Sequence, residues 1–385
     1  DLEARWVARA DGEPVAGGVL DLPDLPPRST ASASIPVTPT LLASLADATE
    51  AHLEVTVSQR VATPWADAGH VVGWDQHQIV LDTPRARRVP RSRVRPEVEI
   101  GPSGWSEISL DGRRLVGPVG VTIWRAPTDN DGGSPGPDRQ ASNRARWHQW
   151  GLDALVPHWD EPGITHDGHG TRVTARGSLV SPEGRGEVRW HRTVLIESSG
   201  RIRVDELASI PGEFFDIPRI GAVLELAAGL EQVRWWGLGP HECYPDRRAS
   251  GMVGVHRASV GDMAEPLVHP QEHGARLDIR EAEFGGPQGR VRVASDLAGP
   301  LLHMRVGHDF DLDLEQAPLA SDLRPRETAE LHLDLATRGV GTGSCGPDTR
   351  PDLRVRPGTY RWRWWLVVEA PGPSEAALTV RPHST

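Results

Sequence analysis

The most persistent feature of the chain is the alternation of apolar and polar residues over short segments, which is typical of strands with one buried face. In residues 2–8, Leu2, Ala4, Trp6 and Ala8 fall on one parity, and the pattern returns at 52–60 and, briefly, at 78–81. A short helix at 40–50 is expected to cross between strands. Short strands with frequent Pro and Gly turns predict an immunoglobulin-like β-sandwich over 1–84.

A change of composition follows this first unit. The stretch 83–96 contains three prolines, no acidic residue, and arginines at 85, 87, 88, 91, 93 and 95. Proline blocks strand pairing and like charges keep a segment extended. We therefore predict an interdomain linker at 85–96. A nucleic-acid patch is the alternative, but a short basic run is more often a solvated connector.

The rest of the chain, 97–385, also alternates, with arginine persistently on the outer parity. The clearest strand segments are 188–196, 201–205, 291–294, 331–335 and 360–368. The exception is 142–152, where Ser142 can cap a helix of two to three turns that stops at Gly151. Long amphipathic helices do not alternate with strands, which argues against a doubly wound sheet or a (β/α)₈ barrel. We predict one large antiparallel sandwich.

Composition and charge exclude several classes of protein. The net charge of −11 does not give the basic field of a nucleic-acid binder. No apolar run approaches the roughly 20 residues that span a bilayer, and no signal peptide is recognisable. Cys243 and Cys345 are expected to be free thiols in a reducing compartment, which favours the cytoplasm. The chain opens at Asp1 in strand-like register without an initiator Met, so we expect a piece of a longer protein.

Four polar stretches interrupt the strands and combine Asp, Glu, His and Arg with Gly or Pro turns. They are 124–133, 235–247, 269–274 and 339–348. This is what a carbohydrate or metal site would require. The run Asp129, Asn130, Asp131 resembles half a calcium loop, but position 12 is Gln140, not the bidentate Glu of an EF-hand, so a turn stabilised by Asx side chains is favoured.

The other candidate chemistries are weaker. No metal-ligand spacing supports a zinc site at His241, Cys243, His269 and His273, so no metal site is predicted. The glycines at 339–343 lack the Lys-Ser/Thr of a P-loop, and Ser344 lacks the setting of a catalytic serine. Glu242 and Glu272 could pair as in a glycosidase, but structural ion pairs with nearby arginines are the favoured interpretation.

Taken together, the stretches resemble the C-terminal portion of the bacterial β-galactosidases of glycoside hydrolase family 2. Residues 125–131 (Arg-Ala-Pro-Thr-Asp-Asn-Asp) are similar to the entry into that family's last domain. Residues 236–247 are similar to its Gly-x-Gly-Pro-x-Glu-x-Tyr-x-Asp-Arg block, and 270–274 to its Pro-Gln/Ser-Glu-x-Gly block. Upstream, 62–70 is similar to the preceding β-sandwich. These motifs occur in order along essentially the whole chain.

The resemblance implies an all-β chain in which an immunoglobulin/fibronectin-like sandwich precedes a galactose-mutarotase-like supersandwich. It implies that the catalytic glutamates lie on a (β/α)₈ barrel of roughly 250 residues, for which this chain has no room. The chain is then a non-catalytic part, inactive alone, whose partners are its own missing N-terminal and barrel domains, β-galactoside substrate and copies of itself. No cofactor is implied here, although Mg²⁺ and Na⁺ are possible for the full-length enzyme.

The resemblance also implies which residues border the substrate pocket. The loop 341–347 matches the family's pocket loop, with Ser344 at its tip and Cys345 where the family has a sugar-stacking Trp. A mobile loop containing Arg219 and Gly221 is expected at the same rim. The following motif residues are expected in structural positions: Arg125, Asp129, Asn130, Asp131, Glu242, Tyr244, Asp246, Arg247, His269, Gln271 and Glu272.

A second hypothesis is a stand-alone carbohydrate-binding or aldose-epimerase-like protein. Anomer interconversion needs a general acid and a general base on either side of the sugar ring. The candidates for these roles are His269, Glu272 and His273.

Overall fold

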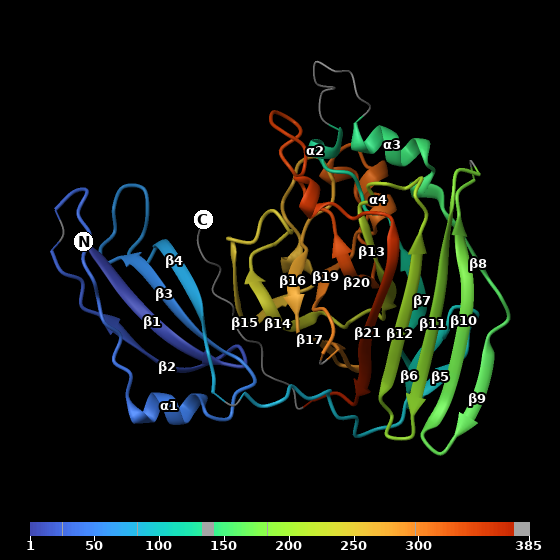
Figure 1. The fold of residues 1–385 in the computed structure, drawn as a ribbon, viewed down its shortest axis with the longest axis horizontal. Helices are drawn as coiled ribbons and strands as arrows, with labels where there is room; N and C mark the ends of the chain where they lie inside the picture. The colour runs from blue at the N-terminus through green and yellow to red at the C-terminus, as the bar shows by residue number, and fades with distance from the viewer. Residues whose placement is uncertain (25, 83, 133–141, 183, 297, 373–385) are drawn as a thin grey trace.

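In a computed structural model, the structure describes residues 1–24, 26–82, 84–132, 142–182, 184–296 and 298–372. Figure 1 shows a smaller β unit at the N-terminal end, joined by an extended segment to a larger unit that contains the rest of the described chain. All strand pairs are antiparallel, so the predicted all-β fold is confirmed.

The smaller unit is a four-stranded sheet with the order β2-β1-β3-β4. Its strands are β1 (Leu2–Ala10), β2 (Glu13–Leu20), β3 (Ala51–Gln59) and β4 (Val71–Ile79). The predicted strand at 78–81 is therefore the end of a longer one. Thr38 caps helix α1 (Pro39–Leu45), whose Leu41 and Leu45 pack on Trp6.

Helix α1 lies where a β-sandwich would have its second sheet. Among the described residues, 1–82 form one sheet, and α1 with Ile35 supplies the second layer over its buried face. The physical reason lies between β2 and α1. Prolines at 23, 26, 27, 36 and 39 remove backbone donors there, so this stretch cannot pair as a strand.

The larger unit is a sandwich of two sheets (Figure 1). The ten-stranded sheet has the order β15-β14-β17-β18-β21-β12-β11-β10-β8, with β9 also paired to β10. Its strands are β8 (Val156–Trp159), β9 (Gly163–Asp167), β10 (Gly170–Val180), β11 (Glu187–Glu197), β12 (Ile202–Ile210), β14 (Gln232–Pro240), β15 (Gly251–Ser259), β17 (Glu281–Gly286), β18 (Gly289–Ser295) and β21 (Gly358–Glu369).

The seven-stranded sheet has the order β16-β19-β20-β13-β7-β6-β5. Its strands are β5 (Glu97–Glu99), β6 (Glu107–Leu110), β7 (Arg113–Thr122), β13 (Arg219–Leu226), β16 (Arg276–Ile279), β19 (Leu302–Gly307) and β20 (Ala329–Thr337). The short helices α2 (Asp129–Gly132), α3 (Asn143–Gln149) and α4 (Asp311–Gln316) lie outside the sheets. Ser142 caps α3 and Gly151 follows it in the left-handed conformation, as predicted.

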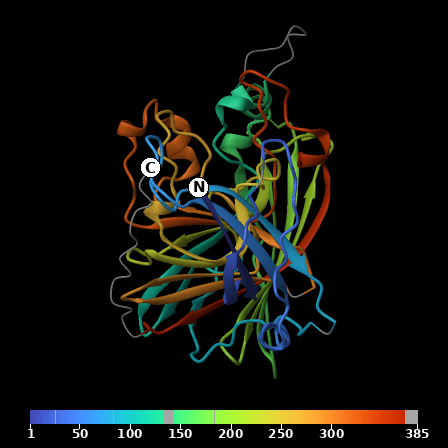
Figure 2. The same ribbon diagram turned by 90° about the vertical axis from the view of Figure 1, so that its left-hand side faces the viewer.

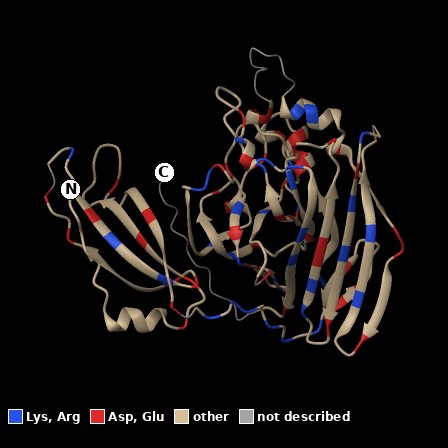
Figure 3. Ribbon diagram, viewed as in Figure 1, with Lys and Arg blue, Asp and Glu red and all other residues tan. Residues whose placement is uncertain are grey.

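The core of the larger unit is mainly aliphatic and also contains several tryptophans and a buried ion pair. Trp105 packs edge-on against Trp364. The carboxylate of Glu206 accepts hydrogen bonds from Trp190, Trp364 and the guanidinium of Arg192, which is wholly buried. Figure 3 shows arginines recurring along β10 to β12. Arg192, however, lies on the inner parity with Trp190, so the expectation that strand arginines point outward is wrong at this position.

The smaller unit is bound to the edge of the larger one. In Figure 2 its strands lie in front of the larger unit. The Gln76 amide makes two 2.8 Å hydrogen bonds with the backbone of Val253, and Val255 N donates to Gly12 O at 3.0 Å. The segment after β4 is bound as well, because the Arg87 guanidinium donates to the carbonyl of Asp296.

Candidate functional site

The helical turn α2 connects three parts of the larger unit through three consecutive side chains. Asp131 is buried and accepts hydrogen bonds from Arg125 at 2.7 Å and from the backbone and hydroxyl of Thr128. Asp129 exchanges hydrogen bonds with the Gln271 amide. Asn130 contacts the loop after β20. The prediction of a turn stabilised by Asx side chains is confirmed, with Asp131 as the residue that closes it.

The loop after β20, residues 339–348, is called here the rim loop. Its base is fixed by Arg338, whose side chain has no exposure. Arg338 donates from Nε to Asp216 Oδ1 at 2.8 Å, from Nη1 to Thr349 at 2.7 Å, and from Nη2 to both Asp348 oxygens at 2.8 and 3.0 Å. Burial opposes ionisation of Asp348, but the bonds from Arg338 outweigh it and lower the pKa of that carboxyl.

The tip of the rim loop is held by two polar side chains from elsewhere in the chain. Asp246 accepts from the backbone N–H of Val340 at 3.0 Å and of Gly341 at 2.7 Å. Asn130 donates to Gly341 O and accepts from Ser344 N and Oγ. Ser344 and Cys345 are exposed at the tip, and their place at a pocket rim stays a prediction.

The predicted motif residues around Glu242 form a second anchored loop. One Glu242 oxygen accepts from Gly274 N at 2.9 Å and the other from the Arg247 guanidinium. Burial raises the pKa of Glu242. Tyr244 is buried and donates to Glu272 at 3.3 Å. These contacts join the block at 236–247 to the block at 270–274.

Glu272 belongs to a buried charge cluster, called here the Arg219 cluster: Arg219, Arg305, Glu272, Asp311, Glu330, His332 and Asp334. Arg219 pairs with Glu272 at 2.9 Å, Asp311 at 3.1 Å and Asp334 at 3.5 Å, all with side chains at most 9% exposed. Although burial acts to raise it, the pKa of Glu272 is lowered because Arg219 and Arg305 stabilise its charge.

This placement corrects the predicted mobile loop at the rim. Arg219 and Gly221 lie in β13 and both are buried, so neither is exposed at a pocket edge. Gly221 is needed for close packing, since a Cβ there would lie 2.2 Å from Asp334 Oδ1. The expectation came from the family resemblance, whereas in this chain the segment is part of β13, which pairs with β20 and β7.

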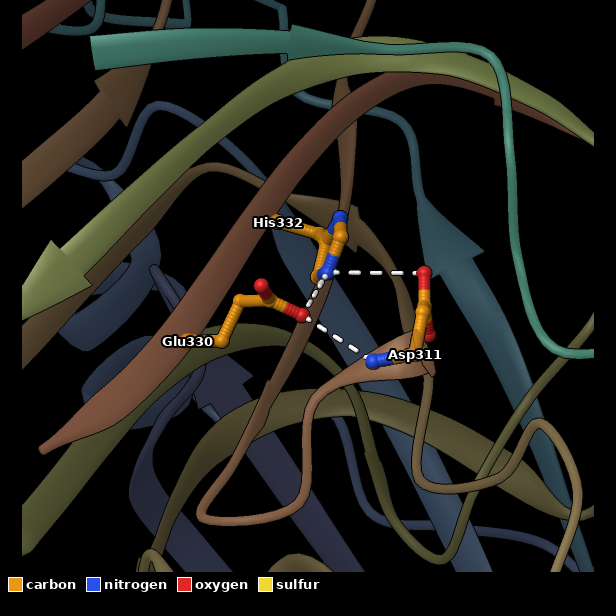
Figure 4. Close-up of side chains that lie close together, drawn as sticks. All are labelled: Asp311, Glu330 and His332. Atoms are coloured by element: carbon orange, nitrogen blue, oxygen red, sulfur yellow. Dashed lines mark hydrogen bonds and ion pairs between the residues drawn. The ribbon is translucent and has the colours of Figure 1, made fainter. Parts of the chain in front are cut away.

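Sequence reasoning missed the titratable residues of β20. Figure 4 shows the His332 ring between Glu330 and Asp311, with Nε2 2.9 Å from Glu330 Oε1 and 3.7 Å from Asp311 Oδ2. Burial lowers the pKa of His332 to about 3. The alternation at 331–335 places His332 and Asp334 on the polar parity, but both are buried, with Asp311 of α4 beside His332 and Arg219 of β13 beside Asp334.

These three groups lie within 4.8 Å of one another, a spacing that could hold a metal ion. Asp311 is, however, already paired with Arg219 at 3.1 Å and Arg305 at 3.5 Å, and Arg305 lies 3.8 Å from Glu330. Two guanidinium groups this close would repel a divalent cation. The donor set therefore fits Mg²⁺ poorly, and we derive no chemistry from a metal here.

A cavity of about 330 Å³ opens beside Glu330, with mostly apolar walls that include Pro118, Trp159, Val223 and Phe310. None of the predicted rim residues lines it.

His269 is 55% exposed, whereas the His273 ring is buried and accepts from Glu265 N. Glu272 is inaccessible, so the acid and base proposed for an epimerase do not meet at an open site.

Comparison with known proteins agrees with the motif order. Residues 102–366 match the family described as Beta galactosidase small chain, and residues 1–80 match Beta-galactosidase, domain 4. Among solved structures, galactose 1-epimerase from Lactobacillus acidophilus superposes with a TM-score of 0.39 at 10% identity, over 84% of this chain and 96% of that one.

Curated relatives extend over nearly all of the chain. A Beta-galactosidase of Arthrobacter sp. (strain B7) is 31% identical over 93% of this chain, and one of Vibrio cholerae is 26% identical over 94%. The chain spans only 37% and 36% of their lengths. Since the family match extends over more than half of the chain, the protein belongs to the β-galactosidase small chain family.

Proposed function

We propose that this chain is the non-catalytic C-terminal part of a longer β-galactosidase. The full-length enzyme would hydrolyse terminal β-D-galactose residues of β-galactosides, and this part would shape the rim of its active site through Ser344 and Cys345. The observation that carries the proposal is the coverage of the relatives: nearly the whole chain aligns with about a third of each β-galactosidase.

The carboxylates of the motif loops support the same proposal. A retaining glycosidase needs two carboxyl groups about 5 Å apart that face one cleft. Both Glu242 oxygens are bound by Arg247 and Gly274, and the Glu272 side chain is wholly buried against Arg219. Each carboxylate stabilises a loop, which leaves neither available as nucleophile or acid.

The wider assignment follows from this proposal. The partners are the missing N-terminal and barrel domains, substrate at the rim, and further copies in an oligomer. Any Mg²⁺ or Na⁺ of the full-length enzyme would be bound outside this chain. The division into 1–84, the linker 85–96 and 97–385 is part of the proposal.

Two free cysteines support a cytoplasmic location. No helix in the part of the chain that the structure describes is long and apolar enough to cross a membrane.

The test is activity on a chromogenic β-galactoside, with the chain purified from a host strain that lacks its own β-galactosidase. We expect no turnover from the chain alone, and turnover from the longer protein. Activity of the isolated chain that is lost in Glu242→Gln or Glu272→Gln would overturn the proposal, because it would place the chemistry here.

No feature of the site favours the stand-alone alternative, since its three candidate residues are engaged separately. Calorimetric titration with galactose and polarimetry of mutarotation test it. Heat of binding together with faster mutarotation would support the stand-alone alternative.

A further inference from the structure

We propose that Asn130 is the positioning residue of the rim loop: it fixes the loop's conformation and so determines where the side chain of residue 345 lies at the pocket edge. The inference deepens the proposed function, because the pocket itself belongs to that proposal. The positioning, in contrast, is a property of this chain alone and can be measured on it.

The base and the tip of the loop are held by different means. At the base, Arg338 makes buried contacts to Asp216, Thr349 and Asp348. These fix where the loop leaves and rejoins the sandwich, but they do not contact residues 342–346. The tip therefore needs its own restraint.

Within the tip, backbone hydrogen bonds close a small turn. Cys345 N and Gly346 N both donate to Thr342 O, at 3.1 and 2.7 Å, and the Thr342 hydroxyl donates to Pro347 O. The turn is thus preformed as a unit. Two side chains from elsewhere in the chain bind this part of the loop. Asp246 accepts from the backbone of Val340 and Gly341, just before the turn, and Asn130 binds the turn itself.

Asn130 reaches both sides of the turn. Its Nδ2 donates to Gly341 O at 2.9 Å, and its Oδ1 accepts from Ser344 N at 3.1 Å and Oγ at 2.8 Å. Its own carbonyl lies against Gly343, where a Cβ would approach to 2.3 Å. An amide offers a donor and an acceptor on two separate atoms of one short side chain, which is the chemistry needed here.

The backbone of Asn130 is in turn held in place by its neighbours. Asp131 is fixed by Arg125 and Thr128, and Asp129 N donates to Gln271 at 2.9 Å. Because the residues on either side are fixed, the Asn130 side chain is a preorganised clamp. The residue after Ser344 is Cys345, so loss of the clamp would release the position that faces substrate.

The chain offers its own probe for the test. Cys345 is exposed, while Cys243 is wholly buried and burial raises the pKa of its thiol, so a thiol-specific nitroxide reagent will label Cys345 selectively. Cys345→Ser should take up no label. In the wild-type chain we expect the electron paramagnetic resonance spectrum to be dominated by one slow, immobilised component.

Three variants then decide the matter on the isolated, folded chain. Asn130→Ala should shift the spectrum to a fast component, and Asn130→Asp, which keeps the acceptor but loses the donor to Gly341, should give a mixture of both. Arg350→Ala is the control, since the Arg350 side chain pairs with Asp352 and not with Asn130 or the rim loop, and its spectrum should be unchanged. An unchanged spectrum in Asn130→Ala with an unchanged melting temperature would overturn the inference.

The second arm uses the longer enzyme and separates this inference from the proposed function. There Asn130→Ala should raise KM more than it lowers kcat, and the rise should depend on the size of the aglycone. If the nitroxide at Cys345 becomes mobile in Asn130→Ala but the kinetics are unchanged, Asn130 positions the loop and the loop does not border the pocket. Changed kinetics with unchanged label order would contradict positioning by Asn130.

Discussion

The molecule buries two clusters of charge that differ in how well their carboxylates are hydrogen-bonded. At the base of the rim loop, Arg338 makes four hydrogen bonds to the carboxylates of Asp216 and Asp348 and a fifth to the Thr349 hydroxyl. In the Arg219 cluster, Asp334 Oδ1 has no hydrogen-bond partner, and Oδ2 lies 3.5 Å from the Arg219 guanidinium.

The two environments move carboxyl pKa values in opposite directions. Asp348 has a lowered pKa, because bonds from Arg338 outweigh the effect of burial. Burial raises the pKa of Asp334 to about 7, although Arg219 opposes the shift. Proximity to arginine alone therefore does not keep a carboxylate charged: Asp348 is hydrogen-bonded and 37% exposed, whereas Asp334 is buried and its Oδ1 has no hydrogen-bond partner.

The largest effect is expected from Arg338→Met, which roughly keeps the side-chain volume but removes the shortest guanidinium contacts of Asp216 and Asp348. Removing one partner of a buried pair typically costs about 3–5 kcal/mol. We expect the urea midpoint to fall accordingly at pH 7. A loss below about 1 kcal/mol would mean that Arg146 and Arg354, which lie 3.9 and 3.8 Å from Asp216, suffice as counter-ions.

The next effect is a pH dependence from Asp334. Its folded pKa of about 7 exceeds the unfolded value of 3.8, so between these values the folded state binds the extra proton. Stability from this group is thus present below pH 3.8 and is lost as the pH rises to 7. The two pKa values differ by about 3 units, so at about 1.4 kcal/mol per unit the loss should be at most about 4 kcal/mol.

The measurement compares urea unfolding of the wild-type chain and Asp334→Asn at pH 4.5 and at pH 7.5. The neutral variant should gain stability relative to wild type at the higher pH. Parallel profiles, or a gain at the lower pH, would contradict the raised pKa and would remove the difference between the clusters.

A smaller effect of opposite sign is expected from Asp348. Its lowered pKa stabilises the fold above its ordinary value of 3.8, and this stabilisation is lost as the pH falls through the folded pKa. The side chain is 37% exposed, so we expect Asp348→Asn to cost only about 1 kcal/mol at pH 7. The wild-type advantage should shrink on acidification, and an advantage that grows would contradict the assignment.

The sequence predicted many of the strands and the motif loops, but not which faces of the strands are buried. Alternation predicted β1, β11, β20 and β21, and motif order placed the loops around Asn130 and Glu242. The polar parity of β20 has the same pattern as a solvated face. Whether it is buried depends on residues near Asp311, and such long-range packing leaves no trace in local periodicity.

Arg192 shows the same limit within a strand. Its neighbours Trp190 and Val194 share its inward parity, so the pattern does mark it as a core position. Arginine is nonetheless expected outside, because a buried charge requires a partner. That partner, Glu206, lies on the next strand and could be identified only once the pairing of β11 with β12 was known.

The smallest effect completes the comparison, because it pairs similar hydrogen-bond geometry with very different burial. Arg350 binds Asp352 through Nε and Nη2 at 3.1 and 2.9 Å, the same two atoms with which Arg338 binds Asp216 at 2.8 and 3.2 Å. Arg350 is 76% exposed, whereas Arg338 is not exposed at all. We expect Arg350→Ala to change the unfolding free energy by less than about 0.5 kcal/mol, because solvent screens the pair and the free side chain regains rotamer entropy. If urea unfolding gave Arg350→Ala and Arg338→Met similar losses, hydrogen-bond geometry alone would determine the strength of these pairs, and burial would not be the cause of the difference.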